Sequence, residues 1–118
     1  MKHYLRMGKV MKKRFFVMFI ILSMTSAVFA SEADKYIADL DPAKDENTII
    51  KAADWCRDKE EKKASGKLVS LLSDSRDMVR LHAVMALGYI GGEDNIDAIN
   101  NVLLNDKNPH VRYTALLS

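Results

Sequence analysis

The sequence predicts an all-α fold, a short α-solenoid of antiparallel helix pairs with about two and a half repeats. One pattern occurs twice at an offset of 32 residues, as Leu71-Leu72-x-Asp74 with Val79-Arg80-x-x-Ala83 and as Leu103-Leu104-x-Asp106 with Val111-Arg112-x-x-Ala115. Apolar residues around these motifs recur three and four positions apart, which is the spacing of one helix face. No segment alternates polar and apolar residues over the length of a strand.

Residues 1–30 have the form of a secretory signal peptide. Residues 1–14 hold six basic side chains and no acid, and a mainly apolar run follows over residues 15–30. This pattern predicts cleavage between Ala30 and Ser31 and export to the periplasm or out of the cell. The alternative is an uncleaved inner-membrane anchor over residues 15–30, although this run is shorter than the roughly 20 residues that span a bilayer core.

The charge balance changes when the export signal is removed. Met11 begins a second segment of signal-peptide form, so residues 1–10 can be an upstream start. Cleavage leaves all 16 acids and 12 of the 18 Lys and Arg residues, a formal net charge of 12 − 16 = −4. The excess of basic residues therefore belongs to the export signal, which argues against a nucleic-acid partner.

Cys56, the single cysteine, is expected to be a buried apolar side chain, with an intermolecular bridge as the alternative.

The exported chain divides into a capping segment over residues 31–44 and a repeat domain over residues 45–118. In the capping segment, Tyr36 and Leu40 give one helical turn of apolar contacts before Pro42. A residue that precedes proline is disfavoured in a helix, so this segment ends there.

Within the repeat domain, helices are expected over residues 45–58, 67–72, 76–90, 93–104 and 109–118. The first has Ile49, Ala53 and Cys56 at the i, i+4, i+7 positions of one face. Residues 59–66 are highly charged, which is typical of a solvated turn. The turn before residue 76 is predicted from Ser73-Asp74-Ser75.

The later helices have clear apolar stripes and end signals. The stripe of the third helix comprises Val79, Ala83, Ala86, Leu87 and Ile90, and that of the fourth comprises Ile96, Ile99, Val102 and Leu103. Gly91-Gly92 predicts the end of the third helix. Asn108 and Pro109 predict an N-cap and a first helical residue for the last helix.

The two units of the 32-residue repeat resemble the short bacterial HEAT-like repeat, a type that also occurs in phycobilin lyases. The matching positions run from Leu71-Leu72 to Ile90-Gly91 in one unit and from Ile90-Gly91 to Ala115-Leu116 in the next. A degenerate first unit aligns Ile49 with Val79 at an offset of 30, and it has Ile50 where the later units have arginine. The resemblance covers roughly residues 40–118.

The resemblance implies a structural ladder and a face for partners. In the family, polar residues at the turns lock successive repeats, and the matching positions are Asp74, Arg80, Asp106 and Arg112. The second helix of each pair would line the concave face, which makes Ser70, Asp97, Asn100 and Asn101 possible partner-binding residues. Tyr89 and Tyr113 are further candidates, because aromatic side chains are enriched in interface cores.

No catalytic, metal or cofactor site is expected. His82 and His110 are the only histidines after residue 30, and they lack the spacing of a metal motif. Asp94 and Asp97 lie near the start of a helix, where acids favour the helix dipole.

The predicted function is therefore an exported protein-interaction or scaffold module of the cell envelope, not an enzyme, with no cofactor and with a membrane contact only before cleavage. One alternative is a lyase-like or other enzyme on the same scaffold, which requires a pocket that gathers His82 or several acids. The others are a structural homodimer through the open C-terminal hairpin and a fragment of a longer repeat array.

Overall fold

The computed structural model describes residues 32–118, and all regular structure in this range is helical. The elements are a helix over residues 32–38, α2 (Glu46–Asp58), the 3₁₀ helix η1 (Lys62–Ala64), α3 (Ser65–Leu71), α4 (Asp77–Ile90), α5 (Glu93–Asn105) and α6 (Pro109–Leu117). Ala33–Ser118 forms one compact unit. The predicted all-α repeat fold is confirmed.

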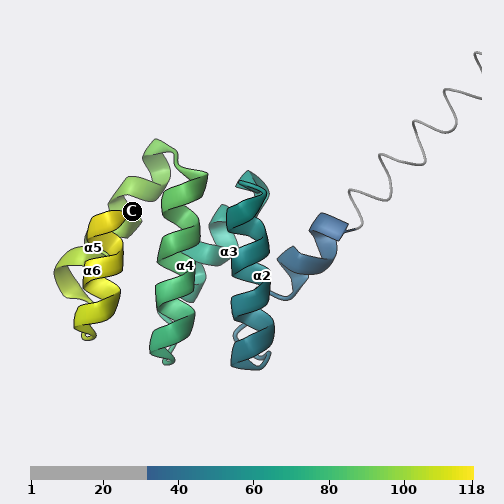
Figure 1. Ribbon diagram of the computed structural model, residues 1–118, viewed down its shortest axis with the longest axis horizontal. Coiled ribbons are helices and arrows are strands. Elements are labelled where there is room, and N and C mark those ends of the chain that lie inside the picture. The colour runs from purple at the N-terminus through teal and green to yellow at the C-terminus, as the bar shows by residue number, and fades with distance from the viewer. Residues whose placement is uncertain (1–31) are drawn as a thin grey trace, which may run out of the picture. The chain divides into compact units, whose positions relative to one another are not determined.

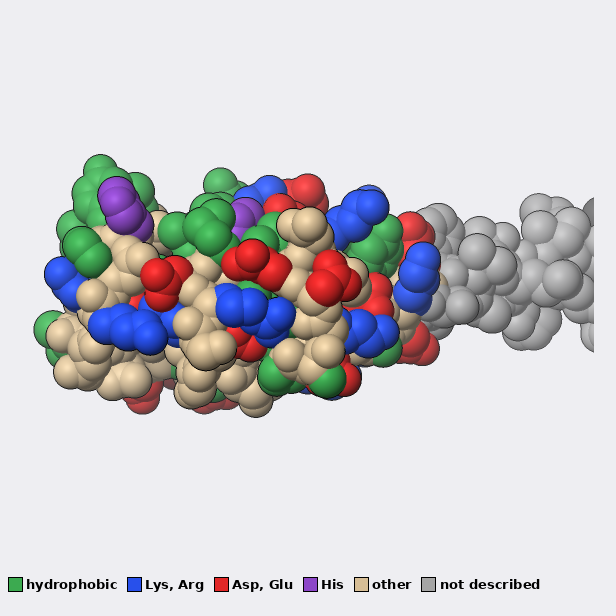
Figure 2. Space-filling model, turned by 90° about the horizontal axis from the view of Figure 1, so that it is seen from below, with side chains coloured by type: hydrophobic (Ala, Val, Ile, Leu, Met, Phe, Trp, Pro, Cys, Tyr) green, Lys and Arg blue, Asp and Glu red, His purple; other side chains and the backbone are tan. Residues whose placement is uncertain are grey.

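The helices form two layers. α2, α4 and α6 lie side by side in one layer, and α3 and α5 lie behind them in the other (Figure 1). The turns over residues 41–45, 73–76 and 106–108 precede α2, α4 and α6 and gather at one edge, which we name the turn edge. This edge lies at the bottom of Figure 1 and faces the viewer in Figure 2.

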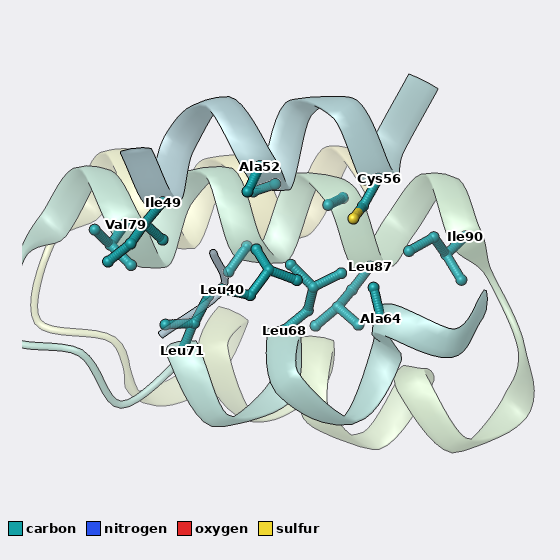
Figure 3. Close-up of a cluster of buried hydrophobic side chains, with 13 residues drawn as sticks. Leu40, Ile49, Ala52, Cys56, Ala64, Leu68, Leu71, Val79, Leu87 and Ile90 are labelled. Carbon is teal, nitrogen blue, oxygen red and sulfur yellow. The ribbon is translucent and has the colours of Figure 1, made fainter. Parts of the chain in front are cut away.

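The core lies between the two layers and consists of two clusters. In the larger cluster, Leu68 of α3 and Leu87 of α4 point toward each other beneath α2, as Figure 3 shows. The smaller cluster comprises Val84, Val102, Val111 and Ala115. Leu72 and Ile99 pack against both clusters, so the two are continuous along the stack.

The helix over residues 32–38 covers α2 on the side away from α4 (Figure 1). Its Tyr36 ring stacks on the Trp55 ring of α2, with the ring centroids 4.7 Å apart. Leu40, which follows the helix, is 3% exposed and belongs to the larger cluster. Trp55 therefore packs within the stack.

The charged segment before α3 is more structured than its composition predicts. Residues 59–66 are expected to be a turn, but η1 begins at Lys62 and α3 begins at Ser65. Glu61 caps η1 by accepting a hydrogen bond from the Lys63 N–H at 3.3 Å, and Ala64 is completely buried. The buried Ala64 and the hydrogen bond from the Glu61 N–H to the Cys56 carbonyl, at 2.9 Å, both hold this segment against α2 and the core.

α5 follows its predicted apolar stripe at Ile99, Val102 and Leu103 but departs from it near its start. Ile96 was expected in the apolar stripe, but it is 53% exposed, and the neighbouring Asn95 is buried instead. Asn95 is satisfied there because its Nδ2 donates to the Gly91 carbonyl at 2.8 Å and to Ser65 Oγ at 3.4 Å. A polar side chain can be buried at low cost when its hydrogen bonds are made.

The turn between α4 and α5 requires glycine. Gly91 has φ 72° and ψ −166°, a conformation that is essentially restricted to glycine. We expect Gly91→Ala to lower the free energy of unfolding by about 1–3 kcal/mol. Urea titration followed by far-UV circular dichroism measures this loss.

The matched control is Gly66→Ala in α3. An added Cβ at Gly66 meets no atom within 4 Å, and alanine favours a helix over glycine. This variant should gain about 0.4–1 kcal/mol. Equal effects of the two substitutions would contradict the conformational explanation.

The predictions about export concern residues that precede the described part of the chain. The cleavage between Ala30 and Ser31, the upstream start over residues 1–10 and the anchor over residues 15–30 all lie outside it. Within residues 32–118, no helix has both the length and the apolar composition to cross a bilayer. Export therefore stays a prediction.

Candidate interaction surface

A buried arginine at the turn edge joins the second helix pair to α6. Arg80 is 4% exposed, and its Nε and Nη2 donate to the two carboxylate oxygens of Asp106 at 2.9 and 3.1 Å. Nη2 also donates to Asp77, and Nη1 donates to the Asp74 carbonyl at 2.9 Å. Arg80 lies on α4 and Asp106 precedes α6, so this bidentate pair crosses between successive repeats.

The equivalent carboxylate one unit earlier has a different partner. Asp74 accepts hydrogen bonds from Nε and Nη2 of Arg76, both at 2.9 Å. The degenerate first unit has Ile50 where the later units have arginine, so α2 supplies no guanidinium at that position. Arg76 also donates to the carbonyls of Pro42 and Lys44, at 3.0 and 2.9 Å. It thereby joins the first two units in place of the missing arginine.

The third arginine makes only part of this set of bonds. Arg112 Nη1 donates to the Asp106 carbonyl at 2.7 Å, as Arg80 Nη1 does to Asp74. Its Nε and Nη2 have no hydrogen-bond acceptor among residues 32–118. We name the set Asp74, Arg76, Arg80, Asp106 and Arg112 the Asp–Arg ladder.

Of the predicted ladder positions, Arg80 and Asp106 pair across successive units, whereas Asp74 pairs with Arg76, which was not predicted, and Arg112 bonds only the Asp106 carbonyl. The available signal was the combination of two features, namely Ile50 in place of the first arginine and a basic residue two positions after Asp74. An aspartate that lacks a partner in the preceding unit needs one nearby when it is buried.

The ladder carboxylates are held in their charged form. Burial raises the pKa of Asp106, but hydrogen bonds from Arg80 and the Asn108 N–H lower it further, so the net shift is downward. Hydrogen bonds from Arg76 lower the pKa of Asp74. Figure 2 shows the result as acidic and basic side chains that lie next to one another along the turn edge.

A polar groove of about 320 Å³ adjoins the ladder on the side of α3 and α5. Its lining includes Ser73, Ser75, Asn101, Asn105 and Lys107. The Asn101 Oδ1 accepts a hydrogen bond from Asn105 Nδ2 at 2.8 Å. The groove therefore offers more polar than apolar surface, and Leu72 and Val102 contribute to the apolar part.

The predicted polar contact residues lie on this same layer. Ser70 on α3 and Asp97, Asn100 and Asn101 on α5 are all exposed. Only Asn101 lines the groove. The Ser70 hydroxyl is occupied locally, because it donates to the Gly66 carbonyl at 3.2 Å.

The two predicted tyrosines lie on the opposite layer. Tyr89 on α4 is 65% exposed, and with Met85 and Leu117 it lines a groove of about 560 Å³ between α4 and α6. The Arg57 guanidinium lies 5.8 Å from the centroid of the Tyr89 ring, within cation–π range. Tyr113 is exposed on α6 but does not line this groove. The six predicted contact residues therefore divide between two surfaces.

The side chains that could act in catalysis or bind a metal do not lie close together. His82 Nδ1 lies 2.8 Å from Asp54 Oδ1, a contact that joins α4 to α2, and His82 lines neither groove. His110 is exposed at the start of α6. Cys56 is completely buried, and burial raises the pKa of its thiol to about 11. Within the described range, no three potential metal ligands come together.

The stacked helix pairs and the Asp–Arg ladder define an all-α helical repeat protein. Residues 65–118, which span α3 to α6, match the family model described as HEAT repeats. This match supports a HEAT-like repeat for that part of the chain. No curated protein matches the chain.

Proposed function

We propose that this chain is an exported protein-interaction module, which acts as a scaffold in the cell envelope and has no catalytic site of its own. HEAT repeats suggest a scaffold role, because a stack of helix pairs offers extended surfaces for partners. Export is supported by the signal-peptide pattern of residues 1–30.

The observation that carries the proposal is the exposed groove at Tyr89. Aromatic and methionine side chains are enriched at the cores of protein interfaces, and this groove combines Tyr89, Met85 and Leu117. Arg57 adds a cation beside the ring, and arginine and tyrosine are both common at binding hot spots. The polar face with Asn100 and Asn101 would then supply orientation more than affinity.

The interaction is tested by affinity capture from envelope extract with the mature chain as bait. We expect Tyr89→Ala to reduce the recovery of the partner at least about tenfold, as for a hot-spot tyrosine. Lys59→Ala, an exposed change in the turn after α2, is the control and should leave recovery unchanged. Circular dichroism of each variant checks that the fold is intact.

A double variant separates the two surfaces. If Asn100→Ala with Asn101→Ala abolishes recovery while Tyr89→Ala does not, the polar face is the binding surface and the groove is not. If the mature chain recovers no protein above the level of an unrelated helical bait, the interaction role is refuted.

The export part of the proposal has its own test. We expect the protein in the periplasmic or secreted fraction, with Ser31 as the first residue of the mature chain. N-terminal sequencing after cell fractionation measures this. An intact Met1 or Met11 end in the cytoplasm would refute export.

A further inference from the structure

The polar groove lies inside the stack, between two consecutive units. It is lined by the end of α3, by α5 and by the turns over residues 73–76 and 106–108. Three of its lining side chains, Asp74, Arg80 and Asp106, are charged, but they are buried and already paired within the Asp–Arg ladder. A ligand in the groove therefore meets a preformed lining in which these charges are neutralised, and preformed sites lose less free energy to ordering.

Two asparagines of α5 present free amide groups to this groove. Asn101 and Asn105 are one helical turn apart on the same side of α5, and Asn105 Nδ2 donates to Asn101 Oδ1 at 2.8 Å. Within residues 32–118, the Asn101 amino group and the Asn105 carbonyl oxygen make no hydrogen bond. The pair thus offers a free donor and a free acceptor, from residues that are about 6 Å apart along the helix axis.

This spacing matches the backbone of an extended peptide. Each residue of an extended chain advances by about 3.3 Å, so residues whose N–H and C=O point to the same side recur about every 6.6 Å. A peptide C=O can accept from the Asn101 amino group, and a peptide N–H can donate to the Asn105 carbonyl oxygen. Leu72 and Val102, which also line the groove, provide contacts for aliphatic side chains of such a peptide.

Opposite charges flank the two asparagines. Asp97 is exposed one helical turn before Asn101, on the same side of α5, and Lys107 lines the groove just after α5. The rise from Asp97 to Lys107 is about 15 Å, which is the length of four to five extended residues. A complementary segment therefore carries a basic side chain at one end of this span and an acidic side chain at the other.

We infer that the polar groove binds an extended peptide segment of a partner protein, with its backbone hydrogen-bonded to Asn101 and Asn105, a basic side chain beside Asp97 and an acidic side chain beside Lys107. This inference rests on the proposed interaction role and names the partner chemistry of a second surface.

A neutral oligosaccharide fits the groove less well than a peptide. Sugar hydroxyls can pair with the two amides, but they leave the charges of Asp97 and Lys107 without a partner. Sugar rings also bind well against aromatic faces, and none of the described residues that line the groove is aromatic.

The charge pattern is tested with three synthetic eight-residue peptides that are blocked at both ends. Threonine and valine alternate between two charged positions five residues apart, which matches the span of about 15 Å. The mixed peptide has lysine and glutamate at these positions, and the others have two lysines or two glutamates. At low salt, the mature chain should bind the mixed peptide about threefold to tenfold more tightly than either of the others. Fluorescence anisotropy measures the affinities, and high salt should remove the preference.

Three variants test the assignment of the residues. Asp97→Lys should bind the two-glutamate peptide most tightly, because basic side chains then flank both ends of the span. Asn101→Ala removes the free amino group and should weaken binding of all three peptides by a similar factor, about threefold to tenfold. Asn100→Ala is the matched control, since Asn100 is exposed beside Asn101 but does not line the groove, and it should leave the affinities unchanged. Circular dichroism checks the fold of each variant.

Several results would overturn the inference. These are no saturable binding of the mixed peptide, an unchanged preference in Asp97→Lys, and equal losses from Asn101→Ala and Asn100→Ala. Binding of chitotetraose, a neutral oligosaccharide, that is lost in Asn101→Ala would also overturn it. If the peptides do not bind while capture of a partner depends on Tyr89, the proposed function stands and this inference fails. If the peptides bind as expected but the extract yields no partner, the site is correct and the scaffold role is refuted.

Discussion

Replacing Arg80 with alanine should lower the free energy of unfolding by about 3–5 kcal/mol, because it leaves a buried carboxylate without its partner. The side chains of Arg80 and Asp106 are each 5% exposed, so the native carboxylate relies on Arg80 more than on water for its hydrogen bonds. The same change removes the bond to the Asp74 carbonyl. Urea titration at pH 7, followed by circular dichroism at 222 nm, measures the loss.

Arg112→Ala provides a matched control for this prediction. Arg112 occupies the equivalent position but makes one hydrogen bond, to a carbonyl. Its removal should cost about 0.5–1.5 kcal/mol. Equal losses for the two variants would show that the Arg80–Asp106 pair does not stabilise the stack.

The same pair predicts a dependence on pH. The native pKa of Asp106 is lower than its ordinary value, so ionisation of this group favours the native state. Its contribution is present above the unfolded pKa of about 3.9 and decreases as the pH falls toward the lower native pKa. The difference in stability between the original chain and Arg80→Ala should therefore narrow below about pH 4. A constant difference from pH 7 to pH 3 would contradict this explanation.

Leu87→Ala should lower the free energy of unfolding by about 2–5 kcal/mol, because it leaves a cavity in the larger cluster. Leu87 is completely buried and lies opposite Leu68, between the two layers (Figure 3). A small domain has only about 5–15 kcal/mol of stability, so this single change removes a large share. Thermal and urea unfolding both report it.

Two further variants test the origin of this loss. Leu87→Met keeps most of the volume and should cost less than about 1.5 kcal/mol. Leu104→Ala removes the same side chain from an exposed position and should change stability by no more than about 0.5 kcal/mol. If Leu104→Ala were as harmful as Leu87→Ala, burial in the core would not be the cause.

The sequence was sufficient to predict the repeat because packing positions recur. Val79, Ala83 and Leu87 are each completely buried, and each was predicted from spacing alone. Helix ends were also predictable where they depend on local chemistry, as at Gly91 and at Asn108, whose side chain accepts from the His110 N–H.

The sequence was insufficient where the outcome depends on a neighbouring unit. Periodicity indicates how wide an apolar stripe is, but it does not indicate that Asn95 is buried and Ile96 exposed near the start of α5. The partner of Asp74 depends on what α2 lacks, so it can be found only by comparing Ile50 with the arginines of the later units. The separation of Tyr89 from Asn101 depends on which layer each helix joins, which requires the three-dimensional arrangement.

The Asp–Arg ladder joins consecutive units of the described stack through the turns that precede α2, α4 and α6. Arg76 donates to the carbonyls of Pro42 and Lys44, and Arg80 pairs with Asp106. Each of these bonds is shared between two units, so loosening one unit removes bonds from its neighbour. Residues 32–118 should therefore unfold together as one cooperative body.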